Sequence, residues 1–255
     1  MRITYESRPA PDRRNEDFVV GGPTWVAVLD GATAPAGVDS GCVHDVPWLV
    51  SRLASDLARG MITRGEASLA DILEQAIRST VAAHVDTCDI ANPDSPSSTV
   101  AIVRRRRDLV DYLVLCDSPI VLRRCDGTLT VVDDGRTEQL PGGRPYSLEL
   151  VRSLRNRPGG FWVASTRPEA AREALTGTID ADRVNGVLLM TDGVSRLVTW
   201  FGRSWRDLVD LAEGHGPSGL IEQVRAAEEG HEPPHGAKRH DDATAAWMTW
   251  AEDAM

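Results

Sequence analysis

The chain has 255 residues, of which 42% are hydrophobic and 26% are charged, and its formal net charge at pH 7 is −10. These values are ordinary for a globular protein, and no apolar run approaches the ~20 residues that a membrane-spanning helix needs. The acidic balance also disfavours nucleic acid and anionic membranes as partners. Because the residues after Met1 lack the apolar core of a signal peptide, we expect a cytoplasmic protein. The composition predicts no particular oligomeric state.

The first half of the chain combines apolar strands with two amphipathic helices. Apolar residues near helical spacing predict a helix over 44–59, and Ser68 is placed to cap a second helix that runs to about residue 88. Beyond it, short runs rich in Val, Ile and Leu are separated by turn residues, and Asp126-Gly127 is typical of a hairpin turn. Strands are predicted at 17–20, 24–29, 98–103, 109–116, 120–125 and 129–132.

The second half begins with a segment rich in Pro, Gly and Arg, residues 141–160, and then returns to regular elements. These are predicted as a strand at 161–164, a helix at 168–175, a strand at 184–190, helices at 205–212 and 217–229, and a strand at 243–250. The order of elements predicts mostly antiparallel sheet with helices laid outside it. This is an α+β plan, and we expect a single domain over 1–255.

Four acidic clusters each adjoin an apolar, strand-like run. They are Glu16-Asp17 before 18–20, Asp30 after 25–29, Asp192 after 187–191, and Asp241-Asp242 before 243–248. Buried carboxylates are costly unless something pairs with them. Gathered at one edge of a sheet, these clusters would form a cage of oxygen ligands suited to Mg²⁺ or Mn²⁺. Each cluster taken alone also has a simpler interpretation, as an Asp-Gly hairpin turn, a solvated strand start or a turn held by Asx hydrogen bonds.

Six short motifs occur in a fixed order: Asn-Glu-Asp (15–17), Leu-Asp-Gly (29–31), Ser-Ser-Thr-Val-Ala (97–101), Asp-Ser (117–118), Thr-Asp-Gly (191–193) and Asp-Asp-Ala-Thr (241–244). Each motif alone is weak, but the ordered set resembles the metal-dependent serine/threonine protein phosphatases of type 2C, the PPM family, in a divergent bacterial-type form. The resemblance extends from Asn15 to Thr249. It implies a four-layer α-β-β-α sandwich, in which two stacked, mostly antiparallel sheets are flanked by helices.

The resemblance also implies a centre of two metal ions, Mg²⁺ or Mn²⁺, with a third ion as a further possibility. Glu16 and the carbonyl of Gly31 would bind one ion, and Asp30 would bridge both. The other ion would be held by Asp192 and Asp241. Asp17 would act through bound water or a third ion, which Asp117 would also bind.

This pattern predicts the hydrolysis of phosphomonoesters. Two divalent cations would offset the charge of the substrate and lower the pKa of a bridging water, which would be the nucleophile. Asp30 and Asp192 are therefore the candidate catalytic residues. The resemblance favours phosphoserine or phosphothreonine in a phosphoprotein as the substrate. Two alternatives stay open, a small phosphorylated metabolite as substrate and a regulatory or binding module that has lost catalysis.

The sequence departs from the family pattern at positions that concern the substrate. The family commonly places a phosphate-gripping arginine four residues before Glu16, where this chain has Asp12, so the adjacent Arg13 and Arg14 become the candidate substrate-binding residues. The family has a flap near 141–183, and here that segment carries several arginines, Arg144 and Arg155 among them. It predicts either a lid suited to an anionic substrate or a solvated loop.

Other residues with metal-binding chemistry carry weaker signals. The run His231-Glu232-Pro233-Pro234-His235 fits a zinc-protease pattern, but its two prolines exclude the helix which that motif requires. His44 and His84 fall in predicted helical stretches and are interpreted as surface or core residues. The four cysteines lack a Cys-x-x-Cys spacing and are interpreted as reduced, buried side chains; they are Cys42, Cys88, Cys116 and Cys125.

Overall fold

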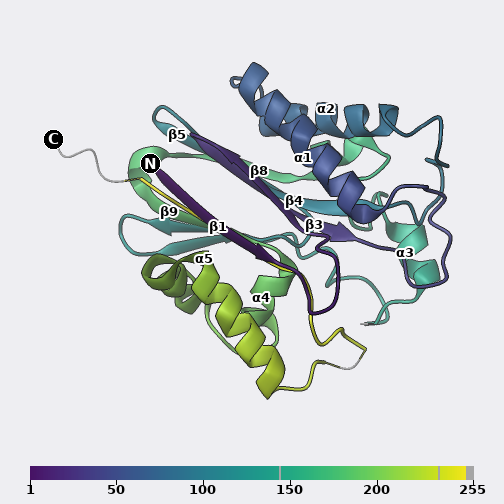
Figure 1. Ribbon diagram of the computed structural model, residues 1–255. Helices are drawn as coiled ribbons and strands as arrows, with labels where there is room; N and C mark the ends of the chain where they lie inside the picture. Colours follow the sequence, from purple (N-terminus) through teal and green to yellow (C-terminus); the bar gives the residue numbers. More distant parts are fainter. Residues whose placement is uncertain (144, 235, 251–255) are drawn as a thin grey trace.

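The computed structural model describes residues 1–143, 145–234 and 236–250. Two five-stranded sheets are stacked on one another, with helices on both outer faces (Figure 1). The strand orders are β1-β10-β9-β6-β7 and β2-β3-β4-β5-β8, and every neighbouring pair is antiparallel. The predicted α+β sandwich is confirmed. The single domain over 1–255 stays a prediction, and its last five residues lie outside the described ones.

The strands are β1 (Arg2–Arg8), β2 (Phe18–Gly22), β3 (Trp25–Ala32), β4 (Ser97–Arg106), β5 (Leu109–Leu115), β6 (Ile120–Arg124), β7 (Leu129–Val132), β8 (Leu175–Asp180), β9 (Val184–Met190) and β10 (Ala243–Thr249). The α-helices are α1 (Val46–Thr63), α2 (Leu69–Ala82), α3 (Leu148–Leu154), α4 (Asp192–Thr199) and α5 (Trp205–Gly230). Two short 3₁₀ helices are η1 (Pro168–Glu173) and η2 (Ala181–Arg183).

The central strands are buried on both faces because each sheet lies between the other sheet and a layer of helices. Alternate residues of a strand point to opposite faces. In β3, Val26 and Val28 pack between the sheets against Val187 and Leu189 of β9. The intervening side chains of β3 pack instead under α1 and α2; they are Trp25, Ala27 and Leu29. Burial on both faces explains why these strands read as continuous apolar runs.

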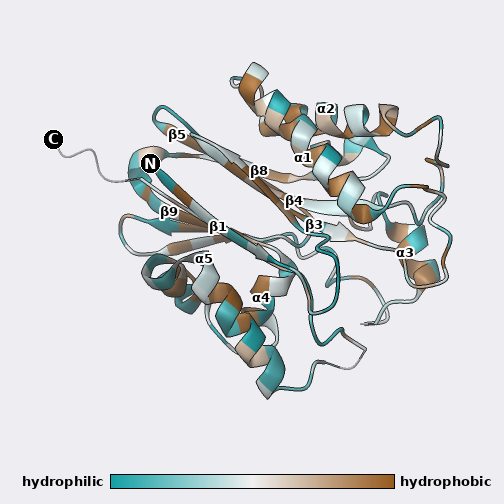
Figure 2. Cartoon of the chain, in the orientation of Figure 1, coloured by the Kyte–Doolittle hydropathy of each residue, from teal (hydrophilic) through white to brown (hydrophobic). Residues whose placement is uncertain are grey.

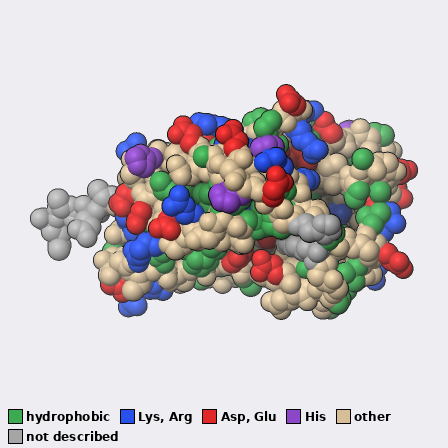
Figure 3. Space-filling model, turned by 90° about the horizontal axis from the view of Figure 1, so that it is seen from below, with side chains coloured by type: hydrophobic (Ala, Val, Ile, Leu, Met, Phe, Trp, Pro, Cys, Tyr) green, Lys and Arg blue, Asp and Glu red, His purple; other side chains and the backbone are tan. Residues whose placement is uncertain are grey.

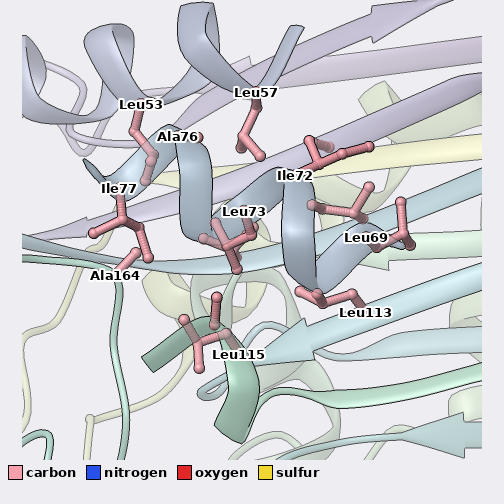
Figure 4. Packing of buried hydrophobic residues seen from close by; sticks show 14 of the residues in the cluster. Leu53, Leu57, Leu69, Ile72, Leu73, Ala76, Ile77, Leu113, Leu115 and Ala164 are labelled. Carbon is pink, nitrogen blue, oxygen red and sulfur yellow. The ribbon is translucent and has the colours of Figure 1, made fainter. Parts of the chain in front are cut away.

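Helices α1 and α2 cover the sheet that contains β3, and α4 and α5 cover the other sheet (Figure 1). Figure 4 shows Leu53 and Leu57 of α1 and Ile77 of α2 in the same apolar layer as Leu113 and Leu115 of β5. The apolar residues of the helices and strands lie mainly toward this interior (Figure 2). Ser68 caps α2 as predicted, but the helix ends at Ala82 rather than near residue 88.

Edge strands and short helices differ from the sequence prediction. Strands β1 and β8 were not predicted, because each lies at the edge of its sheet and carries polar residues along its length. Residues 161–164, predicted as a strand, make only isolated bridges, between Ser98 and Ala164 and between Arg155 and Phe161. Helix α3 lies in the segment read as irregular, and α4 follows Thr191 directly. Helix α5 joins the two predicted helices across a kink at Gly216.

Charged side chains of both signs are distributed over the surface. Acidic and basic groups are interspersed on the face seen in Figure 3, so the net charge of −10 does not form one broad field there. Among the described residues, no helix has the length and apolar character that a membrane crossing requires.

Candidate metal centre

Five aspartates from separate segments converge at one end of the sandwich. Asp30 lies near the end of β3, Asp192 begins α4, and Asp241 precedes β10. Asp117 follows β5 and Asp17 precedes β2. The end of β3 and the start of α4 lie on the side of the molecule nearer α3 (Figure 1). These carboxylates are close enough to raise one another's pKa values, so the structure brings these five predicted ligands together.

Burial and mutual repulsion act in the same direction on this group. Burial raises the pKa of Asp30 well above its usual range, and the charges of Asp17, Asp192, Asp117 and Asp241 raise it further. The pKa of Asp192 rises to about 6, mainly through burial and then through Asp241 and Asp117. Burial also raises the pKa of Asp17, although its hydrogen bonds to Thr hydroxyls lower it in part. Positive charge at this site would therefore stabilise the ionised carboxylates.

The backbones of Glu16 and Gly31 are in close contact at the edge of the acidic group. A Cβ at Gly31 would lie 2.4 Å from the Glu16 carbonyl oxygen and 2.3 Å from a methyl carbon of Val46, so only glycine fits there. The Glu16 carboxylate accepts a hydrogen bond from the hydroxyl of Thr33. These contacts place Glu16 next to the end of β3, and its role as a metal ligand stays a prediction.

Asp242 orients the chain around the site. Its two carboxylate oxygens accept hydrogen bonds from the backbone N–H groups of Ala10, at 2.7 Å, and Glu16, at 2.6 Å. The carboxylate of Asp17 accepts a hydrogen bond of 2.9 Å from the Thr191 hydroxyl. Hydrogen bonds thus join segments that are far apart in the sequence at the acidic group.

Arg196 is a residue of the site that the sequence reasoning missed. Its side chain is only 2% exposed, and it forms ion pairs of 2.9 Å with both Asp241 and Glu228. The guanidinium carbon lies 4.4 Å from the ring centre of Trp200. Arg196 therefore holds Asp241 in place and offsets part of the negative charge. Its position one helical turn after Asp192 on α4 was the available signal.

The donor set fits divalent cations of the Mg²⁺ and Mn²⁺ type. These ions prefer oxygen ligands, and the acidic group presents carboxylates whose repulsion a cation would relieve. Among the described residues, no three acidic side chains have ligand atoms that all lie within 4.8 Å of one another. The carboxylates are therefore spread more widely than the ligands of one small ion.

Arg13 and Arg14 lie on the surface, in the segment before Glu16. Arg14 is 72% exposed and pairs with Asp45 at 2.5 Å, and Asp45 in turn caps α1. Arg13 is exposed in a turn in which its N–H donates to the carbonyl of Ala10 at 3.2 Å. Neither side chain is among the main causes of the pKa shifts of Asp17, Asp30 and Asp192.

Two arginines of the predicted lid have partners within the protein. Arg152 pairs with Asp94 at 2.6 Å, and Arg155 donates to the carbonyls of Pro93 and Ser95. Burial lowers the pKa of Arg155 to about 10. These contacts fasten α3 to the loop before β4, so the two arginines serve the structure of this segment. Arg144, the other arginine singled out for the lid, lies outside the described residues, as does His235 of the zinc-protease-like run.

Two cavities open beside the acidic group. One, of about 180 Å³, is lined by Asp117, Asp192 and Arg196 and also by Asp133, which the sequence did not single out. The other, of about 300 Å³, begins at Asp117 and has a mainly apolar wall; its members include Leu140, Tyr146, Phe161 and Trp200. The second cavity offers space for an apolar part of a substrate next to the charged centre.

Comparisons with known proteins agree with the resemblance seen in the sequence. The profile of the family described as protein phosphatase 2C matches residues 11–225. The chain is similar in structure to the catalytic domain of the serine/threonine protein phosphatase PstP in complex with two manganese ions, with 18% identity, 96% of each chain covered and a TM-score of 0.61. It is also similar to the PPM Ser-Thr phosphatase MsPP from Mycobacterium smegmatis, in complex with cacodylate, with 16% identity, 98% of this chain and 99% of that chain covered and a TM-score of 0.61. A bacterial serine phosphatase shares 13% identity over the whole of both chains, with a TM-score of 0.68. In sequence, the chain matches none of the curated proteins.

The stacked sheets with the carboxylate group at one end define a metal-dependent hydrolase. The profile match covers most of the chain, so the chain belongs to the protein phosphatase 2C family. The resemblance seen in the sequence is confirmed, and the protein is a metal-dependent phosphatase.

Replacing Gly193 should separate the two halves of the site. A Cβ at Gly193 would lie 1.8 Å from the carbonyl oxygen of Asp242, so Gly193→Ala forces apart α4 and the segment that carries Asp241. We expect the free energy of unfolding to fall by more than about 2 kcal/mol. Gly214→Ala is the matched control in α5, where a Cβ meets open space, and should raise stability by about 0.5–1 kcal/mol. Urea unfolding measures both, and a Gly193→Ala protein as stable as the wild type would contradict the close approach.

The burial of Asp192 and its repulsion by neighbouring carboxylates should be visible as a pH effect in metal-free protein. The pKa of Asp192 is about 6, against an ordinary value of 3.8. A raised pKa in the folded state stabilises the protein while the group is protonated, and that contribution is lost as the pH rises from about 4 through about 6. In EDTA at pH 7, Asp192→Asn should therefore be more stable than wild type by on the order of 1–3 kcal/mol.

This advantage should disappear below about pH 4, where Asp192 is protonated in both folded and unfolded wild type. Measuring the difference between variant and wild type cancels the titration of unrelated carboxylates. Asp210→Asn, on an exposed position of α5, is the control and should show no comparable gain. An Asp192→Asn protein that is less stable than wild type at pH 7 in EDTA would argue against repulsion at the site.

Proposed function

We propose that this chain is a serine/threonine protein phosphatase that removes phosphoryl groups from phosphoproteins at the acidic group. The observation that carries the proposal is the convergence of Asp17, Asp30, Asp117, Asp192 and Asp241 in a chain of the protein phosphatase 2C family. The manganese ions of PstP support a centre of two ions in this chain as well. A cytoplasmic location remains a prediction from the sequence.

The residues expected to hold the ions are those predicted from the resemblance. Glu16 and the Gly31 carbonyl would hold one Mg²⁺ or Mn²⁺ ion, Asp192 and Asp241 the other, and Asp30 both. Asp17 and Asp117 would act on bound water or hold a third ion. When bound, the ions supply charge that offsets the phosphoryl group and favour the ionisation of water near neutral pH.

The protein's own residues fix this arrangement. Asp242 positions Glu16 through its backbone N–H, and Arg196 holds one oxygen of Asp241. Thr191 fixes Asp17 through its hydroxyl. Because these contacts orient the ligands before a substrate arrives, little reorganisation would be needed during the reaction.

The surroundings of the site favour a peptide as the substrate. The apolar cavity that begins at Asp117 could receive a side chain next to the phosphorylated residue. Arg13 and Arg14 are the candidates for binding the phosphate, because they are exposed cations in the segment that leads into Glu16. Arg13 is the stronger candidate, since Arg14 already pairs with Asp45.

Metal-dependent hydrolysis of p-nitrophenyl phosphate tests the catalytic centre. We expect turnover with added Mn²⁺ or Mg²⁺, its loss in EDTA, and a fall of at least about a thousandfold in Asp30→Asn and Asp192→Asn. Asp210→Asn should keep wild-type turnover, because Asp210 is exposed on α5. Turnover that persists without divalent metal, or that survives in both site variants, would remove the basis of the proposal. Phosphoserine and phosphothreonine peptides should then be hydrolysed in preference to phosphorylated sugars, and the reverse order would favour a small metabolite as substrate.

Charge removal at the two surface arginines tests the phosphate contact. We expect Arg13→Ala to raise KM for a phosphopeptide by about tenfold, since an exposed charge-assisted contact contributes on the order of 1–2 kcal/mol. Arg14→Ala should have the smaller effect because of its pair with Asp45. Arg107→Ala is the control, because Arg107 follows β4 at the end opposite to the site. Equal KM values in all three variants and the wild type would exclude both candidates.

A further inference from the structure

A second group of side chains with metal-binding chemistry contains none of these carboxylates. Among the described residues, Cys42, His84 and Cys88 are a set whose ligand atoms all lie within 4.8 Å of one another. The sulfur atoms of Cys42 and Cys88 are 3.0 Å apart. Two sulfurs and one imidazole nitrogen are soft and borderline donors, in contrast to the oxygens of the acidic group.

The imidazole of His84 carries the inference. The residue is only 4% exposed, and within the described part of the chain neither of its ring nitrogens has a hydrogen-bond partner. A buried polar group without a partner is costly and calls for an explanation. Trp48 stacks on the ring of His84 at a centroid distance of 5.4 Å and limits access of water on that side. One face of the imidazole is thus closed off, while its ligand atom lies close to the two sulfurs.

The backbone holds the three donors together independently of their side chains. The N–H of Cys88 donates to the carbonyl of His84 at 2.9 Å, which is one turn of α-helical geometry, so both side chains share a face. The loop of Cys42 is fixed to the same region, because the N–H of Asp89 donates to the carbonyl of Gly41 at 2.8 Å. The Asn92 side chain adds a hydrogen bond of 3.1 Å to the carbonyl of Asp39. The donors therefore converge because two loops are hydrogen-bonded to each other.

We propose that Cys42, His84 and Cys88 form a zinc site, with solvent as the fourth ligand. With Zn–S near 2.3 Å and Zn–N near 2.0 Å, tetrahedral ligands lie about 3.5–4 Å apart, which is compatible with the present cluster after a small separation of the sulfurs. Binding would require loss of the two thiol protons and would leave the imidazole neutral. The ion would fasten the loop after β3 to the chain beyond α2, so its role would be structural.

Protection from alkylation tests the site in the unmodified full chain. Freshly reduced protein is treated with iodoacetamide in the presence or absence of Zn²⁺, and each cysteine is quantified by mass spectrometry. We expect zinc to slow modification of both Cys42 and Cys88 by at least about tenfold, because a thiolate bound to zinc is a weaker nucleophile. Cys125 is exposed and outside the cluster, so its rate should be unchanged. Equal rates with and without zinc at Cys42 and Cys88 would overturn the proposal, as would a Cys42–Cys88 disulfide that forms in place of zinc binding.

Cobalt binding gives a second readout that is independent of the acidic group. In a background of Asp30→Asn and Asp192→Asn, Co²⁺ should produce a thiolate-to-metal charge-transfer band. We expect Cys88→Ser to lose this band and Cys125→Ser to retain it. The band also distinguishes the two sites, because carboxylates alone cannot produce it. Its absence from the background protein would overturn the proposal, whatever the outcome of the phosphatase assays.

Discussion

The carboxylate repulsion at one end of the sandwich is the constraint on which the functional architecture depends. Burial raises the pKa values of Asp17, Asp30 and Asp192, and the charges of their neighbours raise them further. Such a group weakens the folded state unless cations offset it, so the stability of the fold must come from elsewhere. Three apolar layers, one between the sheets and one under each pair of helices, supply it. The acidic group can be tolerated because it lies at the end of these layers and not within them.

Backbone contacts position this group more firmly than side-chain contacts alone could. Gly193 and Gly31 allow close approach to the carbonyls of Asp242 and Glu16, and their φ angles are not in the left-handed region. From the sequence alone, Asp30-Gly31 and Asp192-Gly193 could be turns or metal-binding motifs. The structure adds a packing reason for glycine at both positions. Two pieces of chain that carry predicted ligands can lie side by side at these points only because no Cβ separates them.

The sequence predicted the parts of the fold in which burial leaves a clear pattern. Strands β3, β4 and β9 each contain an apolar run because both faces of that run are covered, whereas β1 and β8 are half-exposed edge strands without such a run. Strand β4 also extends beyond the predicted range 98–103, because Arg104 and Arg106 belong to it and both pair with Asp111. Likewise, Cys125 is exposed although all four cysteines were expected to be buried. Arg196 was missed although it lies one helical turn after Asp192, because its ion pairs with Glu228 and Asp241 link residues more than 30 positions apart. The sulfur cluster was missed because Cys42 is likewise distant in sequence from His84 and Cys88.

The two clusters differ in donor chemistry, so each would select a different class of metal ion. The carboxylates favour hard ions such as Mg²⁺ and Mn²⁺, whereas two thiolates and an imidazole favour zinc. Yet one loop joins them, since the segment between Gly31 and α1 contributes Thr33 to Glu16, Cys42 to the sulfur cluster and Asp45 to Arg14. A metal ion bound by Cys42 would restrict the middle of this loop. Thr33, which contacts Glu16, lies on one side of Cys42, and Asp45, which pairs with Arg14, lies on the other. A soft-metal site of this kind would stabilise the wall of the phosphatase centre without placing a ligand in it.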